Sequence, residues 1–206
     1  MALQRRLATE VNDQRSLPKN IKLVAGVDCS YTKKDDKILV AAVVFNTGNW
    51  KQVTSATLVK DCRFPYVSGL LSFREAPAVI EVIEKLDVQP DLLLCDGQGR
   101  AHPRRLGLAS HVGLWLQIPT IGVAKSRLCG DYRMPGTSRG CSTRLIHGGE
   151  VVGRVVRTRD DVKPVFVSPG HLVTLVDAVR WTLRSARKYR LPEPSRAAHH
   201  LVSEIK

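Results

Sequence analysis

Residues 90–96, Pro-Asp-Leu-Leu-Leu-Cys-Asp, decide the fold class of this chain. The short apolar run follows a helical pattern and shows no polar alternation, which is typical of a strand buried on both faces of a parallel sheet. Parallel neighbours are joined by crossover segments, usually helices that cover the faces of the sheet. The stretch therefore predicts an α/β protein.

Apolar patterns on either side of this strand extend the prediction. Residues 73–86 and 103–116 carry apolar side chains at helical spacing, and a short strand is expected at 119–123. Upstream we expect an antiparallel meander of three strands, and downstream two strands and a long helix. These further elements are expected over residues 21–27, 38–45, 50–59, 150–157, 165–167 and 169–188. Their order predicts a mixed α/β sheet with helices on both faces.

The chain length predicts a single domain over residues 1–206. Apolar residues at a spacing of four over residues 2–15 predict a short amphipathic helix, and residues 1–19 are assigned to this N-terminal helix. Residues 134–147 are rich in Gly, Ser and Thr and are expected to form a mobile loop. Residues 196–206 are expected to form a mobile tail.

The charge balance indicates the class of partner. Lys and Arg number 32 and Asp and Glu 19, which gives a net charge of +13. A small folded domain this basic usually binds a polyanion, and nucleic acid is the first candidate. A basic surface that serves only solubility is the plainer alternative.

Hydropathy and cysteine spacing indicate the compartment. No apolar run reaches the length of about 18 residues typical of a membrane span, and the N-terminus lacks the apolar segment of a signal peptide. The 5 cysteines are widely spaced, with no C-x-x-C pair, which disfavours a disulfide framework and a structural zinc site. We therefore expect a cytoplasmic protein with no membrane partner.

Three carboxylates are candidates for a metal centre. Asp28 and Asp96 each close an apolar strand, and Glu75 lies at the start of a helix. Ligands of open α/β sheets gather beyond the carboxyl ends of the strands. If the two strands are neighbours, Asp28 and Asp96 repel each other unless a cation binds, and oxygen ligands favour Mg²⁺ or Mn²⁺. Any one of these acids alone is more often a turn residue or a helix cap.

Two further side chains are candidates for chemistry. Lys125 follows the strand at 119–123, where an ammonium group could offset phosphate charge. His171 is expected at the start of the last helix, where it could orient a water molecule or carry a proton. The plainer alternatives are a surface lysine and a histidine in the first turn of a helix.

A glycine-containing segment and an aromatic loop are candidates for base binding. Gly97 and Gly99 allow the backbone to approach an anion or a planar base, and His102 could position a nucleotide. The absence of a third glycine argues against a dinucleotide fingerprint. In the apolar loop 64–71, Tyr66 could act as a wedge between stacked bases, or the loop could simply cover the core.

Taken together, these motifs resemble the endonuclease V family, the deoxyinosine 3′ endonucleases. The resemblance covers roughly residues 20–196, and its blocks occur in the expected order. The blocks are Val24–Asp28, Pro65–Tyr66, Gly69–Glu75, Asp96–His111, Pro119–Lys125, Ser168–His171 and Leu191–Pro194.

The resemblance implies a ribonuclease H-like fold and a role in DNA repair. It implies Mg²⁺-dependent hydrolysis, with Mn²⁺ able to substitute, of the second phosphodiester bond 3′ to deoxyinosine. The products would carry 3′-hydroxyl and 5′-phosphate ends. The expected partner is DNA that contains deoxyinosine, bound by a monomer, and activity on inosine in RNA stays open.

The resemblance also implies residue roles. Asp28, Glu75 and Asp96 would form the acidic metal centre, with Asp28 and Asp96 as direct ligands. Lys125 would be catalytic, and His171 would assist with water. Tyr66 would lead a strand-separating wedge. The pocket for the flipped hypoxanthine would be shaped by Leu71, Gly97, Gly99 and His102.

One position departs from the family pattern. The wedge is Pro-Tyr-Val-Ser, where many bacterial members have Pro-Tyr-Ile-Pro, so Ser68 replaces a stiffening proline. The preference between duplex, single strand and RNA is therefore open.

Two other functions remain as alternatives. A basic nucleic-acid-binding module without catalysis would account for the charge, but not for acids at two strand ends. Another nuclease of the same fold, such as a junction resolvase or ribonuclease H, is disfavoured by the tyrosine wedge and the Asp-Gly-x-Gly block.

Overall fold

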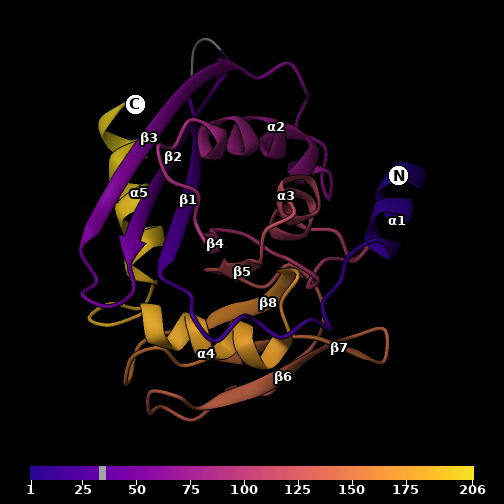
Figure 1. The fold of residues 1–206 in the computed structure, drawn as a ribbon. Coiled ribbons are helices and arrows are strands. Elements are labelled where there is room, and N and C mark those ends of the chain that lie inside the picture. The colour runs from indigo at the N-terminus through magenta and orange to yellow at the C-terminus, as the bar shows by residue number, and fades with distance from the viewer. Residues whose placement is uncertain (33–35) are drawn as a thin grey trace.

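The computed structural model of the protein describes residues 1–32 and 36–206 and contains an eight-stranded mixed sheet (Figure 1). The strand order is β3-β2-β1-β4-β5-β8-β7-β6. The strands are β1 (Leu23–Tyr31), β2 (Lys37–Asn46), β3 (Gln52–Asp61), β4 (Leu92–Cys95), β5 (Thr120–Ala124), β6 (Ser142–His147), β7 (Glu150–Val156) and β8 (Val165–His171). The expected mixed α/β sheet is confirmed.

The middle of the sheet is parallel, as the apolar run at 92–95 predicts. β4 pairs in parallel with β1 on one side and with β5 on the other. β1, β2 and β3 form the expected antiparallel meander. Because β1, β4 and β5 run in the same direction, their carboxyl ends meet at one edge of the sheet.

Helices cover both faces of the sheet, as Figure 1 shows. The helices α2 (Leu71–Glu84) and α3 (Leu108–Leu116) lie together on one face, and α4 (Leu175–Ser185) and α5 (Glu193–Glu204) lie on the other. The helix α1 (Ala2–Thr9) lies apart from the sheet, near α3. Within the described residues, no helix is long and apolar enough to cross a membrane.

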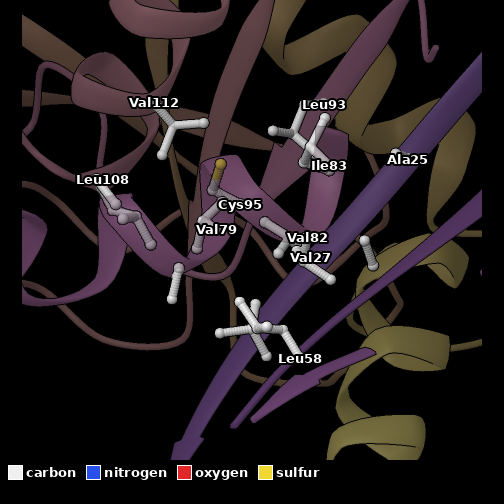
Figure 2. Packing of buried hydrophobic residues seen from close by; sticks show 14 of the residues in the cluster. Ala25, Val27, Leu58, Val79, Val82, Ile83, Leu93, Cys95, Leu108 and Val112 are labelled. Atoms are coloured by element: carbon white, nitrogen blue, oxygen red, sulfur yellow. The ribbon is translucent and has the colours of Figure 1, made fainter. Parts of the chain in front are cut away.

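Two large apolar clusters show why β4 is continuously apolar. On the α2 and α3 face, Cys95 lies beside Val79 and Leu93 beside Ile83, both residues of α2 (Figure 2). On the opposite face, Leu92 and Leu94 pack with residues of α4, including the buried Trp181. Successive residues of a strand point to opposite faces, so a strand covered on both faces needs apolar residues throughout.

The C-terminal segment is not the expected tail. Residues 196–206 lie largely in α5, which packs along β1 and β2 (Figure 1). Ala198 and Val202, four residues apart, are buried. The helix approaches so closely that a Cβ on Gly26 would lie 2.1 Å from the carbonyl carbon of Pro194. The glycine in β1 therefore makes room for α5.

Three further expectations about elements are corrected. The N-terminal helix ends at Thr9, and the chain beyond it crosses the molecule without regular structure to β1. The supposed loop 134–147 contains β6, an edge strand whose exposed face accounts for its polar composition. The long helix expected over 169–188 begins only at Leu175, because Pro169–His171 belong to β8.

Candidate active site

Neighbouring strands bring Asp28 and Asp96 together. In the parallel pair of β1 and β4, Val27 lies opposite Cys95, and Asp96 donates its backbone N–H to the carbonyl oxygen of Val27 at 3.3 Å. β4 ends at Cys95, whereas β1 continues beside β2, so Asp28 lies within β1 rather than at its end. The expected meeting of the two acids at one edge is confirmed.

Burial and mutual repulsion act on Asp28. The residue is 9% exposed. Its pKa is raised above the ordinary aspartate value, first by burial and then by the negative charge of Asp96, while His199 and Lys125 act in the opposite direction. A carboxylate in such surroundings gains from a nearby cation.

Glu75 approaches the same edge from the second turn of α2. It is 7% exposed, and the hydroxyl of Tyr31 donates to its Oε1 at 3.0 Å. Burial raises the pKa of Glu75 to about 7, and the charges of Asp28 and Asp96 also raise it. The three predicted acids therefore share one electrostatic environment.

Lys125 reaches the edge from β5. This strand runs parallel to β4, with Gly122 opposite Cys95, so the residue after its last position emerges beside Asp96. The Nζ of Lys125 forms an ion pair with Oδ2 of Asp96. The position expected for Lys125 is confirmed, and its ammonium group provides local positive charge beside a carboxylate.

His199 is a member of the site that the sequence did not reveal. It lies on α5, and its Nδ1 is 2.6 Å from Oδ2 of Asp28. It belongs to the segment 196–206, which was expected to be a mobile tail. The proline-containing start of α5 and the spacing of Ala198 and Val202 are typical of a packed helix and were the available signal.

The donor set suits Mg²⁺ better than a metal that needs many protein ligands. Within residues 1–32 and 36–206, no three His, Cys, Asp or Glu side chains lie close enough to form a complete metal-binding group. Mg²⁺ usually keeps several waters and binds through one or two carboxylates together with substrate phosphates. Asp28 and Asp96 are oxygen donors on adjacent strands, so the residue types present fit this ion.

His171 does not join the carboxylates, and the position expected for it at the start of the last helix is wrong. β8 runs antiparallel to β5, so His171 lies opposite Thr120 at the start of β5, whereas Lys125 follows its end. The ring is buried, and its Nδ1 accepts the backbone N–H of Asn12 at 3.1 Å. The error arose from placing His171 on a helix instead of at the end of an antiparallel strand.

The pocket loop, residues 97–107, is held by the backbone and by buried side chains. Gly99 donates its N–H to Oγ of Ser168 at 2.9 Å, and Gly97 donates to the carbonyl oxygen of Cys95, so neither N–H points to open space. His102 is buried, and burial together with Arg104 lowers its pKa to about 4. These residues give the loop its shape, and His102 is neutral at physiological pH.

The wedge loop, residues 64–70, lies between β3 and α2 and is more exposed. Tyr66 is 73% exposed, and Leu71 at the start of α2 is 40% exposed. The alternative in which Tyr66 packs inside the core is therefore wrong. A large aromatic side chain in solvent on a basic protein is available for stacking on a base.

The sequence model of the endonuclease V family matches residues 5–200. The chain belongs to the endonuclease V family. Three of its matching blocks, Val24–Asp28, Asp96–His111 and Pro119–Lys125, bring Asp28, Asp96 and Lys125 to one edge of the sheet. Members of the family are metal-dependent nucleases, so the chain is a nuclease.

Individual relatives cover nearly the whole chain. It is 48% identical to endonuclease V of Alkalilimnicola ehrlichii over 203 residues, which is 97% of this chain and 89% of that protein. The crystal structure of endonuclease V from Streptomyces avermitilis superposes with a TM-score of 0.94 at 44% identity, over 99% of this chain and 90% of that one. The ribonuclease H-like fold is thereby confirmed.

A third relative was solved with a nucleic acid. Endonuclease V from Ciona intestinalis superposes with a TM-score of 0.85 at 28% identity, over 99% of this chain and 95% of that chain. Its crystal structure is a complex with a 24mer DNA that contains an inosine followed by a ribo-adenosine.

Proposed function

We propose that this chain is a Mg²⁺-dependent DNA repair endonuclease that hydrolyses the second phosphodiester bond 3′ to deoxyinosine. The products carry 3′-hydroxyl and 5′-phosphate ends. The observation that carries the proposal is the pair of carboxylates, Asp28 and Asp96, on adjacent strands with Lys125 in contact with Asp96. The inosine-containing DNA bound to the Ciona relative supports the choice of substrate.

Asp28 and Asp96 would hold the cation directly, with Glu75 as the third acid of the centre and Mn²⁺ able to substitute for Mg²⁺. When bound, the cation would stabilise negative charge on the phosphate as a Lewis acid. Its positive charge would also lower the pKa of Asp28 and Glu75, and so oppose the effects of burial and of the neighbouring carboxylates, which raise it.

The surrounding residues orient the acids and supply positive charge. The contact from Nδ1 of His199 fixes the direction of the Asp28 carboxylate, and the Tyr31 hydroxyl fixes that of Glu75. The Nζ of Lys125 would leave Asp96 to bind a phosphate oxygen, where it would stabilise the charge that develops during hydrolysis.

Base recognition would use the wedge loop and the pocket loop. An inosine inside a duplex must leave the stack before it can be identified, and the ring of Tyr66 would fill the space it leaves. Hypoxanthine differs from adenine by a carbonyl and a ring N–H in place of an amine and an acceptor. A pocket shaped by Leu71, Gly97, Gly99 and His102 would make that distinction.

We propose that the whole chain is one catalytic domain that acts on DNA as a monomer in the cytoplasm. The net charge of +13 supports binding to the phosphate backbone. Activity on inosine in RNA is a second candidate, because Ser68 in the wedge weakens the argument for a strict duplex substrate.

The test is cleavage of labelled oligonucleotides that contain one inosine, as single- and double-stranded DNA and RNA. Each is incubated with Mg²⁺, with Mn²⁺ and with EDTA, and the cut and its end groups are mapped. We expect a cut at the second phosphodiester bond 3′ to the inosine in the presence of either metal, and no cut with EDTA. The same oligonucleotides with adenine in place of inosine are the control, and equal cutting of both would refute the proposal.

A further inference from the structure

The helix α1 buries one polar side chain. Along α1, Gln4 alone is buried, and it is fully inaccessible to solvent, while Leu3 is 48% exposed. Gln4 lies just before residues 5–200, which match the family. A buried amide costs stability unless its donors and acceptor are satisfied, so its partners define what the residue does.

The amide of Gln4 joins the wedge loop to the pocket loop. Its Nε2 donates to the carbonyl oxygen of Gly69 at 3.1 Å and to that of Leu106 at 3.0 Å. Its Oε1 accepts a hydrogen bond from Nε of Arg104. Gly69 belongs to the wedge loop, whereas Arg104 and Leu106 belong to the pocket loop. One side chain therefore contacts both loops.

The Gly69 carbonyl is the point at which these bonds meet. It also accepts from Nη2 of Arg104 at 2.6 Å. Gly69 has a φ of 76°, and Leu70 donates its N–H to the carbonyl oxygen of Val67 at 2.9 Å, which closes a turn. This backbone suits glycine, and a Cβ would lie 2.5 Å from Nη2 of Arg104. The base of the wedge loop is thus fixed although Tyr66 near its tip is exposed.

We infer that Gln4 is a positioning residue that holds the wedge loop in register with the pocket loop. The inference rests on the proposed function of Tyr66 as the wedge. A base displaced from a duplex must reach the pocket while the wedge fills the gap, so the distance between the two loops has to be fixed. A base in a single strand enters without displacement, and the connection matters less there.

The test compares duplex and single-stranded inosine DNA with the variant Gln4→Met. Methionine keeps the length and helix propensity of the side chain but removes its hydrogen bonds. We expect the single-turnover rate on the duplex to fall about tenfold while the rate on the single strand stays within about twofold, because misplacement of a positioning group penalises the step that depends on alignment. The matched control is Leu3→Ala on the same helix, which should leave both rates unchanged.

A second variant and a spectroscopic signal separate positioning from stability. Gln4→Glu keeps an acceptor for Arg104 but loses the NH₂ group that binds both carbonyls, so the same selective loss is expected. A 2-aminopurine beside the inosine should become less fluorescent in the duplex complex of either variant, because fewer bases are unstacked. All rates are measured below the melting temperature of each variant.

The outcomes distinguish this inference from the proposed function. Equal losses on the two substrates, or an unchanged ratio of duplex to single-strand rates in either variant, would overturn the role of Gln4. If the wild-type protein cuts neither inosine substrate, the proposed function fails instead. If the wild type cuts both but Tyr66→Ala keeps the wild-type ratio, the wedge on which the inference rests is refuted.

Discussion

The carboxylate edge and the wedge loop differ in how the chain holds them. Asp28 and Glu75 are 9% and 7% exposed and extend from the central strand β1 and the packed helix α2. Tyr66 is 73% exposed and extends from a loop whose base is fixed by a turn and a few hydrogen bonds. Both regions consist of residues predicted from the sequence to be functional.

The difference follows from what each region has to do. Phosphodiester hydrolysis needs charged groups in fixed positions, and strands supply such positions better than loops. Entering a base stack needs an aromatic side chain that projects from the protein. We therefore expect substitutions at the edge to abolish cutting on every substrate, and substitutions in the wedge loop to change only which substrates are cut.

The largest effect is expected for Asp28→Asn. The amide keeps the size of the side chain but removes the charge that a cation needs, so the single-turnover rate should fall about a thousandfold on duplex and single strand alike. The matched control is Asp131→Asn, since the Asp131 side chain is 98% exposed. A loss confined to the duplex would contradict a role in hydrolysis.

A smaller loss on both substrates is expected for His199→Ala. Groups that orient a metal-binding carboxylate usually contribute about 10- to 100-fold to metal affinity or activity. Titration of the cleavage rate with Mg²⁺ should show a higher half-saturating concentration. His200→Ala is the control, because His200 lies next to it on α5 and pairs with Glu204 instead. Equal effects of the two substitutions would refute the contact with Asp28 as the cause.

Tyr66→Ala should sharpen the comparison by lowering the cleavage rate on the duplex substrate only. Stacking of a base on an aromatic ring contributes about 1–3 kcal/mol, so we expect about a tenfold loss on the duplex and little change on the single strand. Because Tyr66 is exposed, the melting temperature should not change. A lowered melting temperature together with equal losses on both substrates would mean that the side chain serves the fold.

The smallest effect is a gain, expected for Ser68→Pro. Ser68 is the second residue of the turn that the Val67–Leu70 hydrogen bond closes, and Gly69 has the positive φ of a type II turn. Proline is favoured at that position and stiffens the loop. We expect duplex cutting to rise about twofold to fivefold, the factor that corresponds to the roughly 0.4–1 kcal/mol by which a compatible proline usually favours the ordered form of a chain. A loss on the duplex would show that the loop must bend to work.

Regular apolar patterns made most of the fold predictable. The run at 92–95 predicted β4 and the parallel pairing that brings Asp96 beside Asp28. The edge strand β6 was missed because an exposed strand needs few apolar residues, and its polar composition resembles that of a loop. Local hydrophobic patterns therefore predict buried strands well, but they predict strands at the edge of a sheet poorly.

The errors in the site come from long-range packing. His199 contacts Asp28 only because α5 folds back onto β1 at Gly26, which no local spacing predicts. His171 was misplaced because the direction of β8 was unknown, and an antiparallel strand ends at the opposite edge of the sheet. The acids and Lys125 were predictable because parallel strands place the residues that follow them at one edge.

The most direct test of this division of roles is to measure binding and cutting by Asp96→Ala on the same preparation. Binding of inosine DNA is followed by fluorescence anisotropy without metal, and cutting by single-turnover cleavage with Mg²⁺. If the carboxylate edge performs hydrolysis and the wedge and pocket loops bind the inosine, the variant does not cut inosine DNA but binds it as tightly as the wild type. Binding could even be tighter, because a negative charge has been removed. Cutting at a near-normal rate with Mg²⁺, or loss of inosine binding together with cutting, would contradict the account.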